Sequence, residues 1–558
     1  MKLNLFPALF ATALALQAQP VTSAVAMRDG VKLATDVYLP ASAGKFPVLV
    51  SRSPYGKSGE RRTAEFFAQN GYVFVAQDVR GRGASEGRLY PLRDEGRDGY
   101  DTIQWAAAQP WSNGKVGTLG ASYLGMDQYS AAILKPPALV AMYAAVAGFS
   151  YYKDAAYRGG VRGTGWPVWL LFSASTSRKA ERDPELKQRL TAIVNNPDKW
   201  LAQTPKEREK IFDGFPDQLE VYRDFYKHHS LDDYWKQPGL NPGAFLGQMK
   251  GVPMMMVGGW YDSFTDSMLE VFTRQRPETR ILVGPWPHPY GKPFCGQATF
   301  GPTAELDERS LQLEWFDHWL KGAAWRTPAD PIRYFRMGGA GASVKDAAHI
   351  NPGGEWRAAK TWPPAGAANP KLYLSAARTL VGMPGASAEP ITYTFDPEHP
   401  NPTQGGRSGP TCIVNQTVNR ADVISFTGAP ILKAVDATGP VIVHLWISSD
   451  RPSTDFTARL IDVYPDGWAM NLAEGQIRVE KMQPGKVREI TLELGSTSNL
   501  FEKGHRIRLD ISSSSFPRLE PNPGTGEPGM WVNRMPAKNS LYTGTRFPAY
   551  LELTVLPD

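Results

Sequence analysis

The sequence predicts an α/β protein with a mostly parallel central sheet, a helical insertion within that part, and an all-β domain after it. The first half contains short, nearly continuous apolar runs that alternate with helical patterns, as in strands buried on both faces. This alternation stops between Phe149 and Lys250 and then resumes. From Pro331 onward, many short strands parted by Pro, Gly, Asn and Asp predict a β-sandwich or jelly roll.

The composition excludes several function classes. A chain of 558 residues favours two to four domains, and 42% hydrophobic with 21% charged residues is typical of a globular protein. The formal net charge of +6 is small and acids are interspersed with bases, so we expect no nucleic-acid partner. Beyond the N-terminus no apolar stretch is long enough to predict a membrane span. Nothing in the sequence indicates an oligomeric state.

Residues 1–24 differ from the rest of the chain. Lys2 precedes an apolar stretch from Leu3 to Leu16, and small residues follow, with cleavage positions after Ala18 or Ala24. This pattern predicts a secretory signal peptide and a periplasmic or secreted protein, and the alternative is a buried N-terminal strand or helix. In an oxidising compartment Cys295 and Cys412 would pair, but two free buried thiols fit equally well. No Cys/His spacing indicates a metal site.

We assign residues 25–148 and 250–340 to the α/β core. It opens with a hairpin from Val25 to Tyr38 that turns at Asp29 and Gly30. The strands expected in the sheet are Phe46 to Val50, Tyr72 to Ala76, Val116 to Leu119, Leu139 to Val146, Val252 to Val257 and Arg280 to Val283. Helical patterns between them cover Thr63 to Gln69, Gly99 to Ala108 and Ser267 to Arg274.

Two further parts complete the expected organisation. Residues 149–249 are helical and rich in aromatic side chains, so we expect a cap over the carboxyl edge of the sheet, with an independent helical domain as the alternative. A helix from Ala304 to Lys321 ends at Gly322. Residues 341–558 then form the β-sandwich.

The segment from Gly117 to Gly125 predicts a nucleophilic serine. Ser122 lies at the sharp turn between a buried strand and the helix from Tyr123 to Leu134, where such a serine is exposed at the top of a sheet. The usual turn has glycine two residues after the serine, whereas here Leu124 takes that place. A packed helix start with an incidental serine therefore remains an equal alternative from this motif alone.

A serine nucleophile needs a base and a carboxylate that orients it. In α/β hydrolases these follow the serine in the order Asp, His, each just past a strand. Asp262 follows the run that ends at Val257, and His288 follows the run that ends at Val283. None of the other histidines lies just beyond a later core strand. The rival carboxylates are Asp266, which resembles a helix N-cap, and Asp317, which is inside a helix.

The negative oxygen formed by serine attack needs hydrogen-bond donors. One expected donor is the backbone N–H of Tyr123, the residue after the nucleophile. The second normally comes from the loop after an early strand, here Ser51 to Lys57. That loop has no glycine run, but Tyr55 behind Pro54 offers a hydroxyl, with a packed aromatic side chain as the alternative.

These motifs together resemble the cocaine esterase family, which includes α-amino acid ester hydrolases and glutaryl acylases and is related to the X-prolyl dipeptidyl peptidases. The segments that carry the resemblance are Ser53 to Gly56, Asp78 to Gly87, Gly120 to Gly125, Gly259 to Asp262, Trp315 to Gly322, and Asp455 to Arg478. The resemblance implies an α/β-hydrolase core, a helical cap and a C-terminal jelly roll. It also implies Ser122, Asp262 and His288 as the catalytic triad and Tyr55 as the oxyanion tyrosine. The family shows the same glycine three residues after the serine, so Gly125 supports the resemblance.

One departure bears on specificity. The α-amino acid ester hydrolases carry an acidic pair just after the catalytic aspartate to hold the substrate amine, whereas here Phe264 and its neighbours are uncharged. Phe264 fits an apolar wall for an aryl or acyl group, and Trp166 and Trp169 are further substrate-binding candidates that fit the cap core equally well. The arginines between Asp78 and Gly87 are expected to brace the scaffold against Asp94 and Glu95.

The predicted function is hydrolysis of carboxylic esters, with amides also open, through an acyl-enzyme on Ser122. The substrate would be a small molecule, and this chemistry needs no cofactor. A glutaryl β-lactam acylase or an X-Pro-type dipeptidyl peptidase would use the same machinery. A protein of another class, which binds carbohydrates or surfaces through its jelly roll without catalysis, is the remaining alternative.

Overall fold

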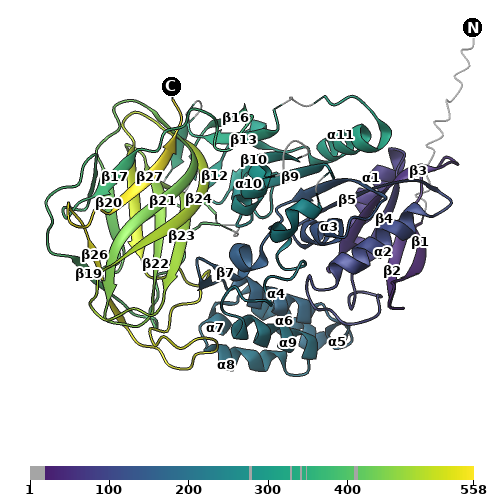
Figure 1. Ribbon diagram of the computed structural model, residues 1–558, viewed down its shortest axis with the longest axis horizontal. Helices are drawn as coiled ribbons and strands as arrows, with labels where there is room; N and C mark the ends of the chain where they lie inside the picture. Colours follow the sequence, from purple (N-terminus) through teal and green to yellow (C-terminus); the bar gives the residue numbers. More distant parts are fainter. Residues whose placement is uncertain are drawn as a thin grey trace, which may run out of the picture.

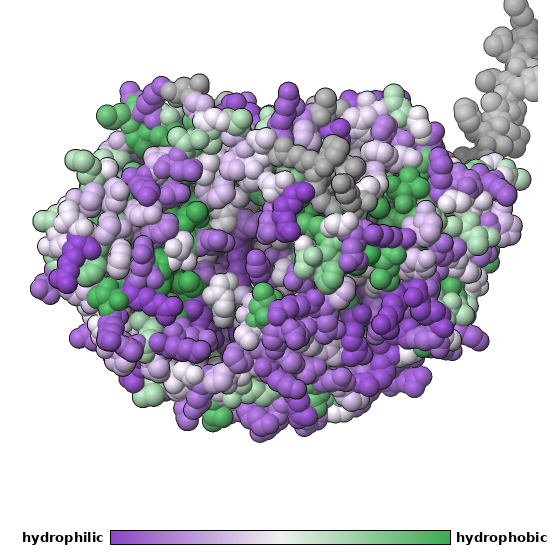
Figure 2. Space-filling view, in the orientation of Figure 1, coloured by the Kyte–Doolittle hydropathy of each residue, from purple (hydrophilic) through white to green (hydrophobic). Residues whose placement is uncertain are grey.

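The computed structural model describes residues 19–249, 251–274, 279–326, 330–339, 342–346, 349–407 and 412–557. Figure 1 shows three parts: an α/β core, a helical part beside it, and a β-sandwich at the opposite end. On the face drawn in Figure 2 the surface is hollowed where these parts meet, and the walls of the hollow are mostly hydrophilic. The predicted fold class is confirmed.

The core is built on one twisted sheet. Its strands are β1 (Val21–Ala26), β2 (Lys32–Tyr38), β3 (Phe46–Ser53), β4 (Val73–Asp78), β5 (Ser112–Ala121), β6 (Leu139–Ala145), β9 (Met254–Tyr261), β10 (Thr279–Pro287), β13 (Ile332–Met337) and β16 (Gly354–Ala359). They lie in the order β1-β2-β4-β3-β5-β6-β9-β10-β13-β16, and the pairs from β4 to β13 are parallel. β16 closes this sheet although it lies within the range that we assigned to the all-β domain.

Helices cover both faces of the sheet, which explains the continuous apolar runs of its strands. One face carries α2 (Glu95–Ala107), α3 (Tyr123–Ile133) and α10 (Thr265–Arg274), and the other carries α1 (Arg61–Gln69) and α11 (Glu308–Lys321). On the second face Phe316 of α11 packs edge-on against Phe67 of α1. As predicted, α11 ends at Gly322, which has the left-handed conformation that favours glycine.

The helical part is inserted between β6 and β9. It contains a short hairpin, β7 (Tyr157–Arg158) and β8 (Val161–Arg162), followed by α4 (Gly165–Ser175), α5 (Arg178–Glu181), α6 (Pro184–Asn195), α7 (Asp198–Leu201), α8 (Pro205–Arg208) and α9 (Pro216–Lys227). Two of these helices, α6 and α8, begin with proline in the first turn and a side-chain cap, made by Asp183 and Thr204. The hairpin was not expected, because each of its strands has only two residues.

The C-terminal part is a β-sandwich. Its strands are β17 (Lys371–Leu374), β18 (Thr379–Val381), β19 (Ile391–Phe395), β20 (Ile424–Gly428), β21 (Val435–Ser449), β22 (Thr454–Val463), β23 (Ala469–Val479), β24 (Arg488–Phe501), β25 (Arg506–Ser512), β26 (Ala537–Tyr542) and β27 (Tyr550–Val555). Antiparallel pairing runs β19-β26-β21-β27-β17 and β20-β25-β22-β23, with β24 beside β21.

The N-terminal prediction falls partly outside the described residues, since 1–18 are not described. Val21–Ala26 pairs antiparallel along its whole length with β2. Cleavage after Ala18 would leave β1 whole, whereas cleavage after Ala24 would remove most of it. In the described part of the chain, no helix combines the length and apolar character needed to cross a membrane.

Candidate active site

Ser122 sits on a strained turn between β5 and α3. Its φ of 59° lies in the left-handed region, which non-glycine residues seldom occupy. The turn is tight: a Cβ on Gly120 would overlap Leu124, and a Cβ on Gly125 would overlap Ala147. Gly125, one residue later than the usual glycine, is thus a position where α3 leaves no room for a side chain beside Ala147.

Asp262 and His288 reach Ser122 from the ends of β9 and β10. His288 Nε2 lies 3.0 Å from Ser122 Oγ, and His288 Nδ1 lies 2.8 Å from Asp262 Oδ1. Because β5, β6, β9 and β10 are parallel neighbours, their carboxyl ends meet at one edge of the sheet. The structure thus brings the three predicted side chains into one hydrogen-bonded chain.

The electrostatics of this chain favour a strong base. The Asp262 side chain is fully buried, whereas the His288 side chain is 32% exposed. Burial disfavours the imidazolium, but the charge and hydrogen bond of Asp262 outweigh it, so the pKa of His288 is raised. The ring of Phe264 covers the imidazole edge-on, with centroids 5.6 Å apart.

The two rival carboxylates have other partners. Asp266 is bound by Arg158 of β7 and by Arg407 of the sandwich domain, so it is an ion-pair residue at a junction rather than a helix cap. Asp317 accepts a hydrogen bond of 2.7 Å from Tyr72 and pairs with Lys321. Neither carboxylate contacts His288 in a recorded hydrogen bond or ion pair among the described residues.

Tyr55 lies beside the serine in the loop after β3. Trp169 of α4 donates its indole N–H to the Tyr55 hydroxyl oxygen at 3.1 Å, which leaves the hydroxyl proton free to be donated elsewhere. Burial of the hydroxyl raises the pKa of Tyr55, and hydrogen bonds to Trp169 and Ser122 oppose this rise. The phenol is therefore protonated at neutral pH and able to donate toward the serine.

Arg82 holds the Tyr55 loop in place, and sequence reasoning missed this role. Its guanidinium donates to the carbonyl of Pro54 at 2.7 Å and to Ser173 and Thr176 at the end of α4. We expected the arginines of this segment to brace Asp94 and Glu95, but Arg80 pairs with Asp98 and Asp29 instead. The arginines of this segment do brace the scaffold, as predicted, but the predicted partners Asp94 and Glu95 were wrong for Arg80.

Tyr123 is positioned by its side chain. Its hydroxyl donates to Glu95 at 2.8 Å and accepts from the backbone N–H of Leu92 at 3.0 Å. Glu95 in turn pairs with buried Arg52 of β3. Since Tyr123 is the first residue of α3, its own backbone N–H has no intrahelical acceptor and is available at the positive end of the helix dipole.

Of the three predicted substrate-binding aromatics, Trp166 and Trp169 stack between the Tyr123 ring and the cap, whereas Phe264 packs against His288. Trp169 lies parallel to the Tyr123 ring at 5.8 Å, and Trp166 lies parallel to Trp169 at 4.9 Å. Tyr151 meets Trp166 edge-on. Trp169 contacts Tyr55 and Phe264 contacts His288, so both lie beside the site, whereas Trp166 is one layer further away and only 7% exposed.

Asp154 is a buried carboxyl that sequence reasoning did not single out. Burial raises the pKa of Asp154 to about 7, against hydrogen bonds from the Ser150 and Phe149 amides. A Cβ on Gly148 would meet both Asp154 and the Phe264 ring, so this carboxyl lies directly behind the aromatic wall. Among the described residues no group of His, Cys, Asp and Glu side chains is arranged to hold a metal ion.

Sequence comparison places the chain among known families. Residues 29–290 match the X-Pro dipeptidyl-peptidase (S15 family), and residues 323–552 match the X-Pro dipeptidyl-peptidase C-terminal non-catalytic domain. Cocaine esterase from Rhodococcus sp. (strain MB1 Bresler) is 31% identical over 582 residues, which cover 95% of this chain and 97% of that protein.

Solved structures share the whole architecture. An aminopeptidase from a marine sediment Thaumarchaeota archaeon superimposes with a TM-score of 0.81 at 23% identity, covering 97% of each chain. An α-amino acid ester hydrolase superimposes with a TM-score of 0.78 at 22% identity, covering 99% of this chain and 98% of the other. These matches confirm the resemblance drawn from the motifs. The chain therefore belongs to the family of serine hydrolases that includes cocaine esterase and the X-Pro dipeptidyl-peptidases.

Proposed function

We propose that this protein hydrolyses carboxylic esters through an acyl-enzyme on Ser122. The observation that carries the proposal is the continuous hydrogen-bonded chain from Ser122 through His288 to buried Asp262. In this role His288 takes the Ser122 proton as the oxygen attacks the ester carbonyl, and Asp262 orients and stabilises the imidazolium. The Tyr55 hydroxyl and the Tyr123 amide bind the oxyanion.

The second half of the reaction uses the same groups. His288 gives its proton to the departing alcohol, and the acyl group stays on Ser122 Oγ. Water then enters, His288 takes one of its protons, and the hydroxide attacks the acyl carbon to release the acid and restore the serine. Each proton taken by the imidazole is returned, so the cycle needs no further reactant.

Aromatic surfaces on two sides of the serine support an ester with an aryl or bulky apolar acyl group. Phe264 lies against His288, and Trp169 lies against Tyr55 and Tyr123. A matched panel of aryl esters, glutaryl amides and X-Pro anilides tests this. Fastest turnover of the aryl esters supports the proposal, whereas preference for either amide would identify an acylase or a dipeptidyl peptidase. No turnover, together with no labelling by a fluorophosphonate, would favour a non-catalytic binding protein.

Removing the Tyr55 hydroxyl tests the oxyanion role. We expect Tyr55→Phe to lower kcat by about 10² to 10³ with little change in KM, because the donor acts mainly on charge that develops in the transition state. The measurement is steady-state kinetics on the best aryl ester. The control is Tyr152→Phe, which removes a hydroxyl that donates to the carbonyl of His229 within the cap. Equal loss in both variants would contradict the role.

The pH profile tests the base. Catalysis needs the neutral imidazole, and the pKa of His288 is raised above the ordinary value of about 6.5. We therefore expect kcat/KM to rise with pH and to level off only above that value. Asp154, with a pKa of about 7, is a second group near the site that titrates in this range. Asp154→Asn should leave the acid limb in place, and movement of the limb in that variant would assign it to Asp154 instead.

We also propose that the protein works outside the cytoplasm. The signal-like N-terminus supports this, as does a disulfide between Cys295 and Cys412, because such bonds persist in oxidising compartments. The start of β1 at Val21 favours cleavage after Ala18. N-terminal sequencing of the exported protein would decide between the two cleavage positions.

A further inference from the structure

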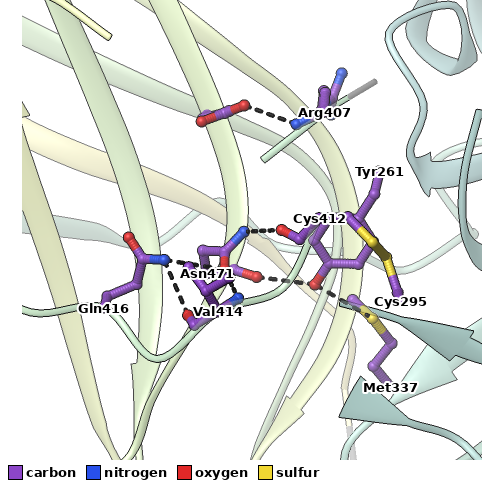
Figure 3. Close-up of a disulfide and its surroundings, with 9 residues drawn as sticks. Tyr261, Cys295, Met337, Arg407, Cys412, Val414, Gln416 and Asn471 are labelled. Atoms are coloured by element: carbon purple, nitrogen blue, oxygen red, sulfur yellow. Dashed lines mark hydrogen bonds between the residues drawn. A yellow bond between two sulfur atoms is a disulfide. The ribbon is translucent and has the colours of Figure 1, made fainter. Parts of the chain in front are cut away.

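Residues near Asp262 and His288 are tied to β23 of the sandwich domain and to a segment beside it. Tyr261 directly precedes Asp262, and Cys295 lies in the loop that follows His288. The segment beside β23 comprises residues 412–416, as Figure 3 shows. It lies in the part of the chain that matches a non-catalytic domain. Together with β23 it nevertheless holds Tyr261, at the end of β9, and Cys295, in the loop that follows β10 and His288.

The first tie is made by Tyr261, the residue before Asp262. Tyr261 is only 1% exposed, and its hydroxyl donates to the carbonyl of Asn471 in β23 at 2.8 Å. The Asn471 side chain donates to the carbonyl of Cys412 at 2.8 Å and accepts from the amide of Val414 at 3.2 Å (Figure 3). The end of β9 is thereby fixed against β23 and the 412–416 segment.

The second tie is covalent. The loop that starts at His288 leads to Cys295, which forms a disulfide with Cys412, with Cα atoms 5.5 Å apart (Figure 3). A backbone hydrogen bond lies beside the disulfide: the backbone N–H of Gln297 donates to the Ile413 carbonyl at 2.8 Å. Gly296 permits this approach, because a Cβ there would overlap the Ile413 carbonyl.

A third tie holds the helix that follows Asp262. Asp266 in the first turn of α10 is bound by Arg407 and accepts from the backbone N–H of Ser496 at 2.8 Å. Both partners belong to the sandwich domain. On the core side, the His288 loop is held by Tyr290, which bonds Glu308 of α11. The His288 loop thus bridges the core and the sandwich domain.

We propose that the sandwich domain positions the acid–base pair, with Tyr261 and the Cys295–Cys412 disulfide as its positioning residues. This inference rests on the proposed function, since it concerns the same triad. The sheet pairs β9 with β10 up to Tyr261 and Pro287. Asp262 and His288 lie one residue beyond this last pair, where the ladder no longer holds the backbone, and their 2.8 Å contact depends on how the two loops that begin there are held. A misplacement of about 1 Å in such a geometry can cost about 10²-fold in rate.

The test combines two variants with three measurements. Cys295→Ser/Cys412→Ser removes the covalent tie, and Tyr261→Phe removes the hydroxyl contact. For the double variant we expect kcat on the best aryl ester to fall by between tenfold and about 10²-fold. The acid limb of kcat/KM should shift to lower pH, because His288 loses part of the interaction with Asp262 that raises its pKa. The rate of fluorophosphonate labelling should fall in parallel, and Tyr261→Phe should show the same changes to a smaller extent.

The control loosens the sandwich domain elsewhere. Arg534→Gln removes contacts to Glu398 and to the carbonyl of Ala202 in the cap, far along the chain from the acid–base pair. Thermal unfolding of all variants identifies any that do not fold, and Tyr261→Phe then carries the test. If the double cysteine variant and Tyr261→Phe lost thermal stability but kept the kcat and the acid limb of the unaltered protein, this inference would be overturned while the proposed function stood. An equal shift of the acid limb in Arg534→Gln would overturn it in the same way. Absence of Ser122-dependent labelling in the unaltered protein would overturn the proposed function and this inference with it.

Discussion

Ser122→Ala is expected to lower kcat for ester hydrolysis by about 10⁶, the largest effect of any single substitution proposed for this protein. Ser122 Oγ is the atom 3.0 Å from His288 that would form the acyl bond, and alanine offers no oxygen in its place. The residual rate would come from the oxyanion donors and substrate binding alone. Steady-state kinetics and fluorophosphonate labelling of the purified variant measure the loss.

The matched control is Ser130→Ala in the same helix. Ser130 is buried, and its hydroxyl donates to the Met126 carbonyl at 3.2 Å within α3, so the variant removes an equivalent group without touching the site. We expect it to retain both turnover and labelling. Near-normal turnover by Ser122→Ala would refute the assignment of the nucleophile.

Asp262→Asn is expected to lower kcat by about 10⁴. The amide can keep the shape of the site, but it presents a donor or an uncharged oxygen to His288 Nδ1, so the imidazole loses its favoured tautomer and the charge that stabilises its protonated form. The acid limb of the pH profile should move to lower pH, because the charge of Asp262 is what raises the pKa of His288. Both quantities come from one set of pH-dependent rate measurements.

Asp317→Asn provides the comparison for this change. Asp317 is a rival carboxylate that binds Tyr72 and Lys321 on α11, away from the imidazole. We expect turnover and the acid limb of Asp317→Asn to match the unaltered protein. A large fall in the Asp317→Asn variant, with activity retained in Asp262→Asn, would assign the orienting role to a carboxylate of α11 and contradict the proposal.

Much of the core could be predicted because each buried parallel strand appears in the sequence as a short, continuous apolar run. The runs from Phe46 to Val50 and from Leu139 to Val146 are apolar on both faces, and the structure covers them with helices on both sides. The positions of Ser122, Asp262 and His288 follow from the same runs, since parallel strands bring their carboxyl ends to one edge. Strand β16 was not predicted because its side chains are exposed or half-buried, so its sequence lacks the apolar run of a core strand.

Contacts between distant segments could not be predicted in this way. The bond from Trp169 to Tyr55 depends on how α4 packs over the core, and a tryptophan in a helix carries no local sign of its partner. The same holds for Arg82, whose acceptors are mainly backbone carbonyls. The pairing of Cys295 with Cys412 depends on how the sandwich domain docks, which no spacing along the chain reveals.

The hydrogen bonds that Arg82 and Trp169 make between the core and the cap connect the position of helix α4 to the position of the Tyr55 hydroxyl. Arg82 joins the Tyr55 loop to the end of α4, and Trp169 of the same helix orients the Tyr55 hydroxyl. Displacement of α4 from the core would break the bonds from Arg82 to Ser173 and Thr176 and the bond from Trp169 to Tyr55, and the Tyr55 hydroxyl would lose the partner that orients it. The packing of the cap helix therefore contributes to the orientation of an oxyanion donor that belongs to the core.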